Sequence, residues 1–297
     1  MRLQGDRQYH YFCPVCGSDV LNYKFDINDF TIIQCRSCKL MLVKEKLSQQ
    51  ELDEYYRKSA KGINTDKDCV YLDQENVENL KYYYRNLRAL IIGKIPAGSI
   101  LDIGCNAGYF LDVMEDFERY GVERSPDHGK IAKEKYGENI FIGTFEDYKP
   151  PDFLFDCISM QDVLDHMVDP VAALEKCNRL LKPDGVLVVK VHDMSSLYAK
   201  IMGINFYALI PPCHLFYFNR TSIAQALEKA SFDAIFYKHM GHLMFLSTIL
   251  FRLTRERQSG IFLDLYKLIN KTRLGHIRIY KNLHDIITVF AVKKRAG

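Results

Sequence analysis

The chain has 297 residues, 48% of them hydrophobic, which is enough for one full domain and a small accessory one. Its formal net charge is only +3, so overall charge does not require nucleic acid as a partner. Residues 1–11 lack the apolar core of a signal peptide, and the longest charge-free apolar stretch near the C-terminus, 239–251, is too short to span a bilayer. With nine cysteines as well, these features predict a cytoplasmic protein with reduced thiols.

The first pattern along the chain is a pair of Cys-x-x-Cys motifs. Cys13 and Cys16 are separated by eighteen residues from Cys35 and Cys38. Two such knuckles can place four thiolates around one tetrahedral Zn²⁺, and zinc supplies about 10–16 kcal/mol of folding free energy in small zinc peptides. We therefore predict that residues 1–45 form a zinc ribbon with a structural Zn²⁺. Two redox-active cysteine pairs are the alternative.

Helical patterns dominate residues 46–98, most clearly at 49–57 and 75–93. The second run contains three consecutive tyrosines, at 82–84. The polar stretch 59–68 between the runs is expected to be a loop. We predict a helical linker or lid over the site of the following domain.

Residues 99–113 predict a buried strand, a tight turn and the start of a helix. The strand carries one acid, Asp102, and the turn holds Gly104 and Gly108, which let the backbone approach a ligand closely. About 20 residues later a second strand ends in Glu123, where a carboxylate can accept both hydroxyls of a ribose. This pair of features predicts a nucleoside cofactor at the strand ends of an open α/β sheet.

The sequence of the turn indicates which class of cofactor is expected. Asn106 stands where the dinucleotide fingerprint has its second glycine, and no Gly-Lys-Ser/Thr triplet of a phosphate-binding loop exists in the chain. A carboxylate inside the strand suits a cationic ligand. Residues 101–108 resemble motif I of the class I S-adenosylmethionine-dependent methyltransferases, whose usual form is Leu-Asp-Ile-Gly-Cys-Gly-x-Gly. Asn106 departs from that form, but Asn tolerates a positive φ almost as Gly does.

An alternating strand and helix pattern follows this motif, typical of a parallel sheet. We predict an α/β, Rossmann-like class I methyltransferase sheet with helices on both faces over residues 99–297, with a helical insert at about 241–285. The expected strands are 99–103, 119–123, 140–142, 154–159, 185–191, 233–238 and 286–292, and the expected helices are 108–117, 127–136, 169–181 and 221–230.

The resemblance extends over roughly residues 10–240. Residues 120–126 are similar to the second motif of the family, 143–146 to its adenine-flanking segment, and 161–166 to its motif IV, where Asp165 replaces the usual Glu. Residues 211–218 resemble a segment of small-molecule and sugar methyltransferases, several of which also carry an N-terminal four-Cys zinc ribbon.

The resemblance implies the residues that hold S-adenosylmethionine. Asp102 would face the methionine ammonium, Glu123 would hold the ribose, and Gln161 would line the methionine side. The remaining expected contacts come from the turn, from the residue after Glu123 and from the adenine segment, namely Gly104, Cys105, Gly108, Arg124, Thr144 and Phe145.

Three histidines follow predicted strand ends and are candidates for a general base, namely His166, His192 and His214. The resemblance favours His166 and His214 as the catalytic residues. His192 with Asp193 is a weaker candidate, because adjacent strand residues point in opposite directions. For each, the alternative is a histidine that bonds the backbone and holds a loop.

We therefore predict a methyltransferase that uses S-adenosylmethionine to methylate a small molecule, such as a sugar or nucleotide-linked sugar, with a histidine base. Two alternatives stay open. The first is a nucleic-acid (RNA) methyltransferase that uses the ribbon for recognition, and the second is a non-catalytic cofactor-binding module. Sequence leaves the oligomeric state and the choice of O-, N- or C-methylation open.

The C-terminal third is basic, since residues 252–295 contain eleven Lys/Arg and three Asp/Glu. This excess could attract an acidic substrate or be a solvated helical face. The apolar stretches 243–253 and 261–269 could line a cavity, form a dimer seam or rest on a membrane surface.

Overall fold

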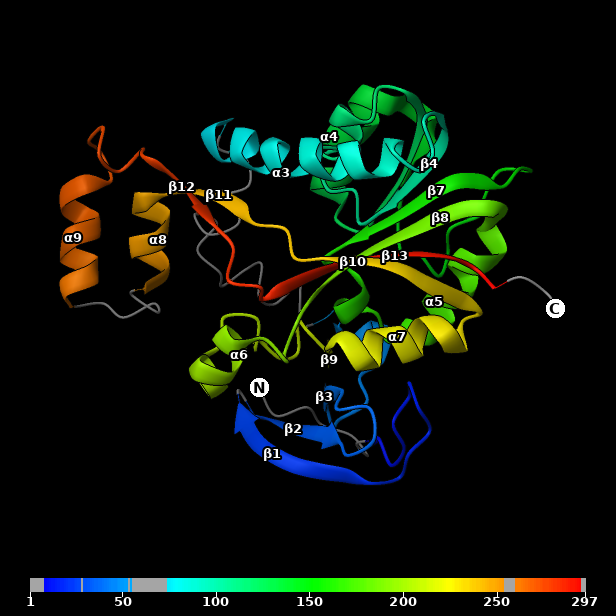
Figure 1. Cartoon of the computed structure of the whole chain (residues 1–297), viewed down its shortest axis with the longest axis horizontal. Helices are drawn as coiled ribbons and strands as arrows, with labels where there is room; N and C mark the ends of the chain where they lie inside the picture. The colour runs from blue at the N-terminus through cyan, green and yellow to red at the C-terminus, as the bar shows by residue number, and fades with distance from the viewer. Residues whose placement is uncertain (1–7, 28, 53, 55–73, 254–259, 295–297) are drawn as a thin grey trace.

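The structure, a computed structural model, describes residues 8–294 except residues 28, 53, 55–73 and 254–259. At its centre is a seven-stranded sheet in the order β10-β13-β8-β7-β4-β5-β6 (Figure 1). The strands are β4 (Gly98–Ile103), β5 (Phe117–Glu123), β6 (Ile140–Ile142), β7 (Phe155–Gln161), β8 (Leu181–His192), β10 (Phe232–Lys238) and β13 (Ile286–Lys293). Each predicted strand of the domain is confirmed.

The five strands from β8 to β6 are parallel, and β13 runs antiparallel to both β8 and β10. β4 pairs with β5 on one side and with β7 on the other, so the strand order reverses at β4. Such a reversal leaves a crevice at the carboxyl ends of the strands, where ligands bind in open α/β sheets. Asp102 lies near that end of β4.

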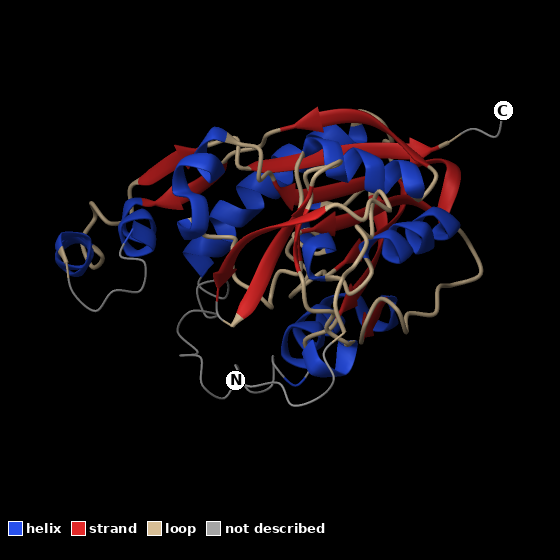
Figure 2. Ribbon diagram, turned by 90° about the horizontal axis from the view of Figure 1, so that it is seen from below, coloured by secondary structure: helices blue, strands red, loops and turns tan. Residues whose placement is uncertain are grey.

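Helices cover both faces of the sheet, as predicted (Figures 1 and 2). The helices α3 (Gln74–Ile92) and α4 (Pro126–Tyr136) lie on one face, and α5 (Pro170–Leu180) and α7 (Arg220–Lys229) lie on the other. Because side chains alternate along a strand, Ile100 of β4 joins the buried cluster under α3, while Leu101 joins the cluster on the opposite face.

Side-chain caps explain where three of these helices start. Ser125 accepts a hydrogen bond from the backbone amide of His128 at the start of α4, and Asp169 does the same for two amides of α5. Asn219 and Ser222 form a reciprocal capping box on α7. Such caps stabilise a helix by about 0.5–2 kcal/mol each.

The predicted helix at 108–117 is wrong. Only a short 3-10 turn, η2 (Leu111–Val113), forms there. Gly108 has a φ of 82°, Met114 ends the turn outside the helical region, and β5 begins at Phe117, so no room remains for a longer helix. The segment after β4 is therefore a tight turn that does not continue into a helix.

The predicted ribbon contains three antiparallel strands, β1 (Leu21–Ile27), β2 (Phe30–Cys35) and β3 (Met41–Val43). Its sheet continues with β9 (Phe216–Tyr217) from the main domain, because Leu42 pairs with Phe216. Both side chains are buried, so the N-terminal segment shares a core with the rest of the molecule.

The insert at about 241–285 is only partly helical. It begins with β11 (His242–Phe245), which pairs with β12 (Arg278–Lys281), and between them lie α8 (Leu246–Leu253) and α9 (Ile261–Ile269). The main domain also contains one short helix, α6 (Leu197–Met202), and the 3-10 turns η3 (Gly137–Asn139), η4 (Leu164–His166) and η5 (Gly203–Asn205).

Of the predicted helix at 49–57, residues 49–52 and 54 are helical, and the remainder, like the predicted loop at 59–68, lies outside the described residues. Within the part of the chain that the structure describes, no helix is long and apolar enough to cross a membrane.

Candidate active site

Asp102 is a buried carboxylate with an unsatisfied oxygen. Only 2% of the residue is exposed, and within the described part of the chain Oδ1 has no hydrogen-bond partner. Burial and the negative charge of Glu123 raise the pKa of Asp102 to about 8, although the hydroxyl of Ser159 on β7 donates a hydrogen bond to it. A cationic group beside Oδ1 would remove this penalty, so the residue fits the ammonium of the cofactor.

The turn after β4 needs residues that accept a positive φ. Gly104, Asn106 and Gly108 have φ values of 75°, 51° and 82°. A Cβ on Gly104 would collide with a methyl group of Val163, and one on Gly108 would lie 2.7 Å from the ring of Tyr136. Asn106 therefore keeps the turn geometry of the glycine that it replaces.

Glu123 joins the turn to the next helix. Its Oε2 accepts a hydrogen bond from the amide of Asn106 at 2.7 Å, and its Oε1 accepts one from the amide of Ser125 at 2.7 Å. These bonds hold the carboxylate at the end of β5. The side chain of Cys105, which precedes Asn106 in the turn, packs in the core against Gly121. Arg124, which follows Glu123, is partly buried, and this burial lowers the pKa of its guanidinium.

Gln161 at the end of β7 belongs to a hydrogen-bonded chain. Its Nε2 donates to Ser159 Oγ at 3.1 Å, and its Oε1 accepts from the Tyr83 hydroxyl at 3.4 Å. The same hydroxyl lies 3.3 Å from Thr288 Oγ1. Sequence analysis missed Ser159 and Tyr83. The only signal was the tyrosine cluster on the predicted lid helix, which does not reveal which ring turns inward.

The segment predicted to flank adenine, residues 143–146, makes local contacts within the turn that contains it. Thr144 Oγ1 donates to Asp147 Oδ2 at 2.7 Å. Phe145 is 3% exposed, and the ammonium of Lys176 lies 4.8 Å from its ring and 2.6 Å from its carbonyl oxygen. The Phe145 ring thus takes part in the core beside this turn.

Three histidines surround one buried carboxylate. Asp165 in η4 is 2% exposed, and its Oδ2 lies 3.4 Å from His192 Nδ1 at the end of β8. The same oxygen lies 3.7 Å from Nδ1 of His214, and Oδ1 lies 3.9 Å from Nε2 of His166. The rings of His166 and His214 meet edge to face, with centroids 4.4 Å apart. The structure therefore brings together all three candidate histidines, and it adds Asp165, which sequence analysis treated only as a substitution in a motif.

The protonation states in this cluster follow from its contacts. Burial lowers the pKa of His214 to about 4, so its ring is neutral near pH 7. Its Nδ1 lies 2.8 Å from the carbonyl oxygen of Ala208, which fixes Nδ1 as the donor and leaves the lone pair on Nε2. Although burial acts in the opposite direction, His166 and His214 hold the pKa of Asp165 well below its usual range.

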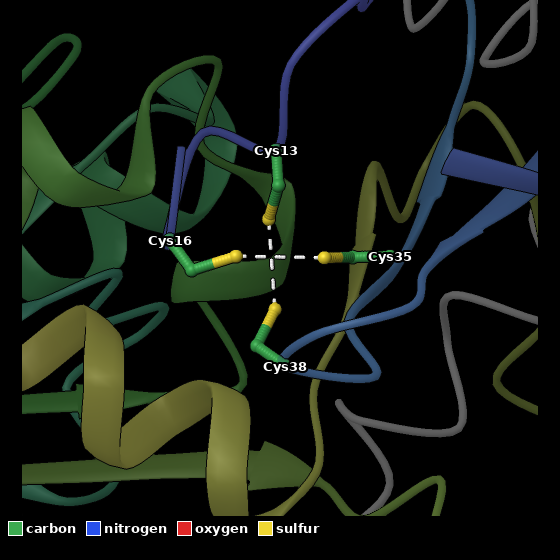
Figure 3. A group of neighbouring side chains, drawn as sticks. All are labelled: Cys13, Cys16, Cys35 and Cys38. Atoms are coloured by element: carbon green, nitrogen blue, oxygen red, sulfur yellow. Dashed lines mark hydrogen bonds between the residues drawn. The ribbon is translucent and has the colours of Figure 1, made fainter. Parts of the chain in front are cut away.

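Two groups of described residues could hold a metal ion, each with ligand atoms within 4.8 Å of one another. One is Asp165 with His166 and His214. The other is the set of four cysteines, which face one another across a small gap (Figure 3). Cys13 and Cys38 have Sγ atoms 3.5 Å apart, and the Sγ atoms of Cys16 and Cys35 are 3.4 Å apart.

The cysteine geometry fits tetrahedral zinc. All four thiols are free, so neither pair is a disulfide. A Zn–S bond of about 2.3 Å implies tetrahedral S–S separations of about 3.8 Å, close to those observed. The donor set is also the one that structural zinc prefers.

Comparison with known proteins shows similarity to methyltransferases. A family model described as a methyltransferase domain matches residues 76–235, more than half of the chain. The ubiquinone biosynthesis O-methyltransferase of Histophilus somni is 24% identical over 155 residues, which cover 48% of this chain and 63% of that protein. The corresponding enzyme of Actinobacillus pleuropneumoniae serotype 5b is 27% identical over 153 residues, with the same coverage. The match thus spans less than two thirds of these relatives.

Solved structures show the same fold at low identity. A methyltransferase of Thermotoga maritima, described as a possible histamine N-methyltransferase, has a TM-score of 0.51 and 19% identity, covering 77% of this chain and 95% of that one. A 1,6-didemethyltoxoflavin-N1-methyltransferase of Burkholderia thailandensis, solved with S-adenosylhomocysteine, has a TM-score of 0.51 and 13% identity, covering 92% and 100%.

The sheet topology and its likeness to these solved structures define a methyltransferase fold. The chain belongs to the methyltransferase-domain family.

Proposed function

We propose that the protein transfers a methyl group from S-adenosylmethionine to a hydroxyl group of a small molecule, such as a sugar or nucleotide-linked sugar. The observation that carries this proposal is the cluster of Asp165 with three histidines, because a hydroxyl acceptor must lose a proton when it is methylated. The O-methyltransferases among the relatives support an oxygen acceptor.

In this proposal the cofactor lies at the carboxyl ends of β4 and β5. Asp102 binds the methionine ammonium, Glu123 binds the ribose, and Gln161 borders the methionine side. Cys105 would contribute through its backbone, since its side chain is in the core. The other contacts come from the residues that sequence analysis named, Gly104, Gly108, Arg124, Thr144 and Phe145.

His166 and His214 are the proposed catalytic residues, with different parts in the proton transfer. The His166 side chain is 32% exposed and that of His214 only 8%, so His166 is the more accessible to an acceptor. We assign proton acceptance to His166, while the neutral His214 packs against its ring and holds it in place. The ionised Asp165 then stabilises the imidazolium that forms. Such general-base help contributes about 10²–10⁴ in rate.

The cofactor supplies an electrophilic methyl group on a sulfonium, so the protein need not activate the donor further. The residues of the protein have two tasks. They align the acceptor oxygen with the methyl group, and they take up the proton of the acceptor. Alignment alone can lower the barrier by about 7–11 kcal/mol.

We further propose that Cys13, Cys16, Cys35 and Cys38 hold a structural Zn²⁺, so that residues 1–45 form a zinc ribbon. The pairing of Leu42 with Phe216 then ties this ribbon to the segment that carries His214. Residues 46–98 would act as a lid, since Tyr83 contacts Gln161.

The test is methyl transfer from isotopically labelled S-adenosylmethionine to a panel of sugars, nucleotide-linked sugars, phenols and amines. Labelled O-methyl product with a hydroxylated acceptor is expected. Turnover confined to amines would refute the oxygen acceptor.

A further inference from the structure

The insert that carries α8 and α9 presents an exposed apolar surface that the proposed function does not use. Both views place these helices at one end of the molecule, away from the central sheet (Figures 1 and 2). On α9, Ile261 and Leu268 are each 70% exposed, and Phe262 is 42% exposed. Large apolar side chains on a helix normally face a core, so this surface indicates a partner.

The chain after α9 also carries exposed apolar side chains. Leu274, Ile277 and Tyr280 are 58%, 46% and 57% exposed. α9 itself packs on α8, where the rings of Phe251 and Tyr266 have centroids 5.2 Å apart. That contact leaves the apolar residues named above outside the protein core. We call residues 261–283 with these side chains the apolar–basic face.

Basic residues outnumber acidic residues in this segment. Residues 261–283 contain one acid, Asp264, and five basic residues. Of these, Lys267, Lys271, Arg273 and Arg278 are exposed, whereas the half-buried Lys281 lies 3.8 Å from Asp285. Basic side chains interspersed with exposed Leu, Ile and Phe are the combination that binds anionic lipid surfaces, since the apolar groups enter the headgroup boundary while the cations meet lipid phosphates.

We propose that the apolar–basic face binds the surface of an anionic lipid bilayer. A second copy of the chain fits less well, because a twofold interface would place the same four exposed cations against each other. Nucleic acid would match the charge but not the exposed aliphatic side chains. α9 has nine residues and is thus about 14 Å long, well short of a hydrocarbon core of about 30 Å, so it lies on the bilayer.

Flotation of the full-length protein with vesicles tests the proposal. Binding is expected to vesicles of phosphatidylcholine with phosphatidylglycerol, and much less to phosphatidylcholine alone. High salt should weaken it, because charges near the surface are screened beyond about 10 Å at 0.1 M. The double variant Ile261→Ser/Leu268→Ser should bind at least about tenfold more weakly, and Lys267→Glu/Lys271→Glu should lose the preference for anionic lipid.

The matched control is Leu197→Ser/Ile201→Ser on α6, where both residues are 73% exposed. It should bind vesicles like the unmodified protein. Affinity for S-adenosylmethionine, which should not change in any variant, verifies that each one is folded and keeps the test separate from the proposed reaction. The proposal is overturned if anionic vesicles do not bind the protein, or if the control loses as much binding as the α9 variant. It is also overturned if sedimentation shows a dimer that Ile261→Ser/Leu268→Ser dissociates.

Discussion

The hydroxyl of Tyr83 on α3 donates a hydrogen bond to Oε1 of Gln161 at the end of β7, with the two oxygens 3.4 Å apart. The ammonium of Lys190 lies 4.7 Å from the centroid of the same tyrosine ring, and His242 stacks on it with ring centroids 4.5 Å apart. One buried side chain therefore connects the proposed lid, the sheet and the C-terminal insert.

Tyr83→Phe should weaken cofactor binding. It removes the hydroxyl from Gln161 and Thr288, and the loss of a buried hydrogen bond costs about 1–3 kcal/mol. The dissociation constant of S-adenosylmethionine, measured by calorimetry, should rise about fivefold or more. Tyr82→Phe, at a residue 39% exposed on the same helix, is the control and should leave it unchanged. Equal effects of the two variants would contradict a lid function for Tyr83.

Cofactor binding should release a proton near pH 7. Asp102 has a pKa of about 8 in the absence of ligand, so it is mostly protonated at that pH. An ammonium beside Oδ1 would favour the ionised form and lower this pKa. Calorimetry in buffers of different ionisation enthalpy measures the release.

Asp102→Asn should abolish the proton release and weaken binding about 10- to 100-fold, because a hydrogen bond to a charged group is lost. Unchanged release in this variant would show that the proton comes from another group.

His166→Gln should lower kcat by about 10²–10⁴ and leave cofactor affinity intact, because it removes the proposed proton acceptor. His214→Gln should lower kcat less. The kcat of this variant should partly recover at high pH, because the more basic solvent can then take up the proton of the acceptor. The control is His239→Gln, since that ring bonds the carbonyl oxygen of Ile286 at 2.9 Å outside the cluster. If His166→Gln retains full activity, the base lies elsewhere.

Acid should destabilise the fold through His214. The folded state keeps this imidazole neutral down to about pH 4, whereas the unfolded chain protonates it below about 6.5. Its contribution to stability is therefore present above pH 6.5 and is lost as pH falls towards 4. The shift corresponds to at most about 3 kcal/mol.

Urea unfolding at a series of pH values measures this dependence. His214→Gln should flatten the curve between pH 6.5 and 4, whereas His284→Gln, at an exposed position, should not. Parallel curves for the unmodified protein and His214→Gln would assign the acid sensitivity to other groups.

Removal of zinc should affect the active site through β9. Cys35→Ser breaks the proposed zinc site, and β3 then loses the support that holds it against Phe216, two residues after His214. We expect one equivalent of zinc to disappear by elemental analysis, together with a lower Tm and a lower kcat. Cys213→Ser, outside the four-cysteine cluster, should retain its zinc. A full complement of zinc in Cys35→Ser would refute the assignment.

Local patterns predicted most of the sheet and its helices, because the signals lie within a few residues. The apolar run of β4 with Gly104 and Gly108 predicts a strand and a turn, and Asp169-Pro170 predicts the start of α5. The prediction of a helix at 108–117 was wrong. The periodicity of the apolar residues there does not show that the chain must already leave the turn at Met114 to enter β5.

By itself, the sequence determined the order of strands and helices, the acids at the ends of β4 and β5, and the spacing of the four cysteines. These depend on residues close together in the chain. Only the tertiary structure decided that His166, His192 and His214 meet at Asp165, that Tyr83 reaches Gln161, and that β9 extends the N-terminal sheet. Apart from the contact between the neighbouring Asp165 and His166, each of these contacts joins residues far apart in sequence. Side-chain packing across the folded sheet, which no local pattern encodes, selects which of them form.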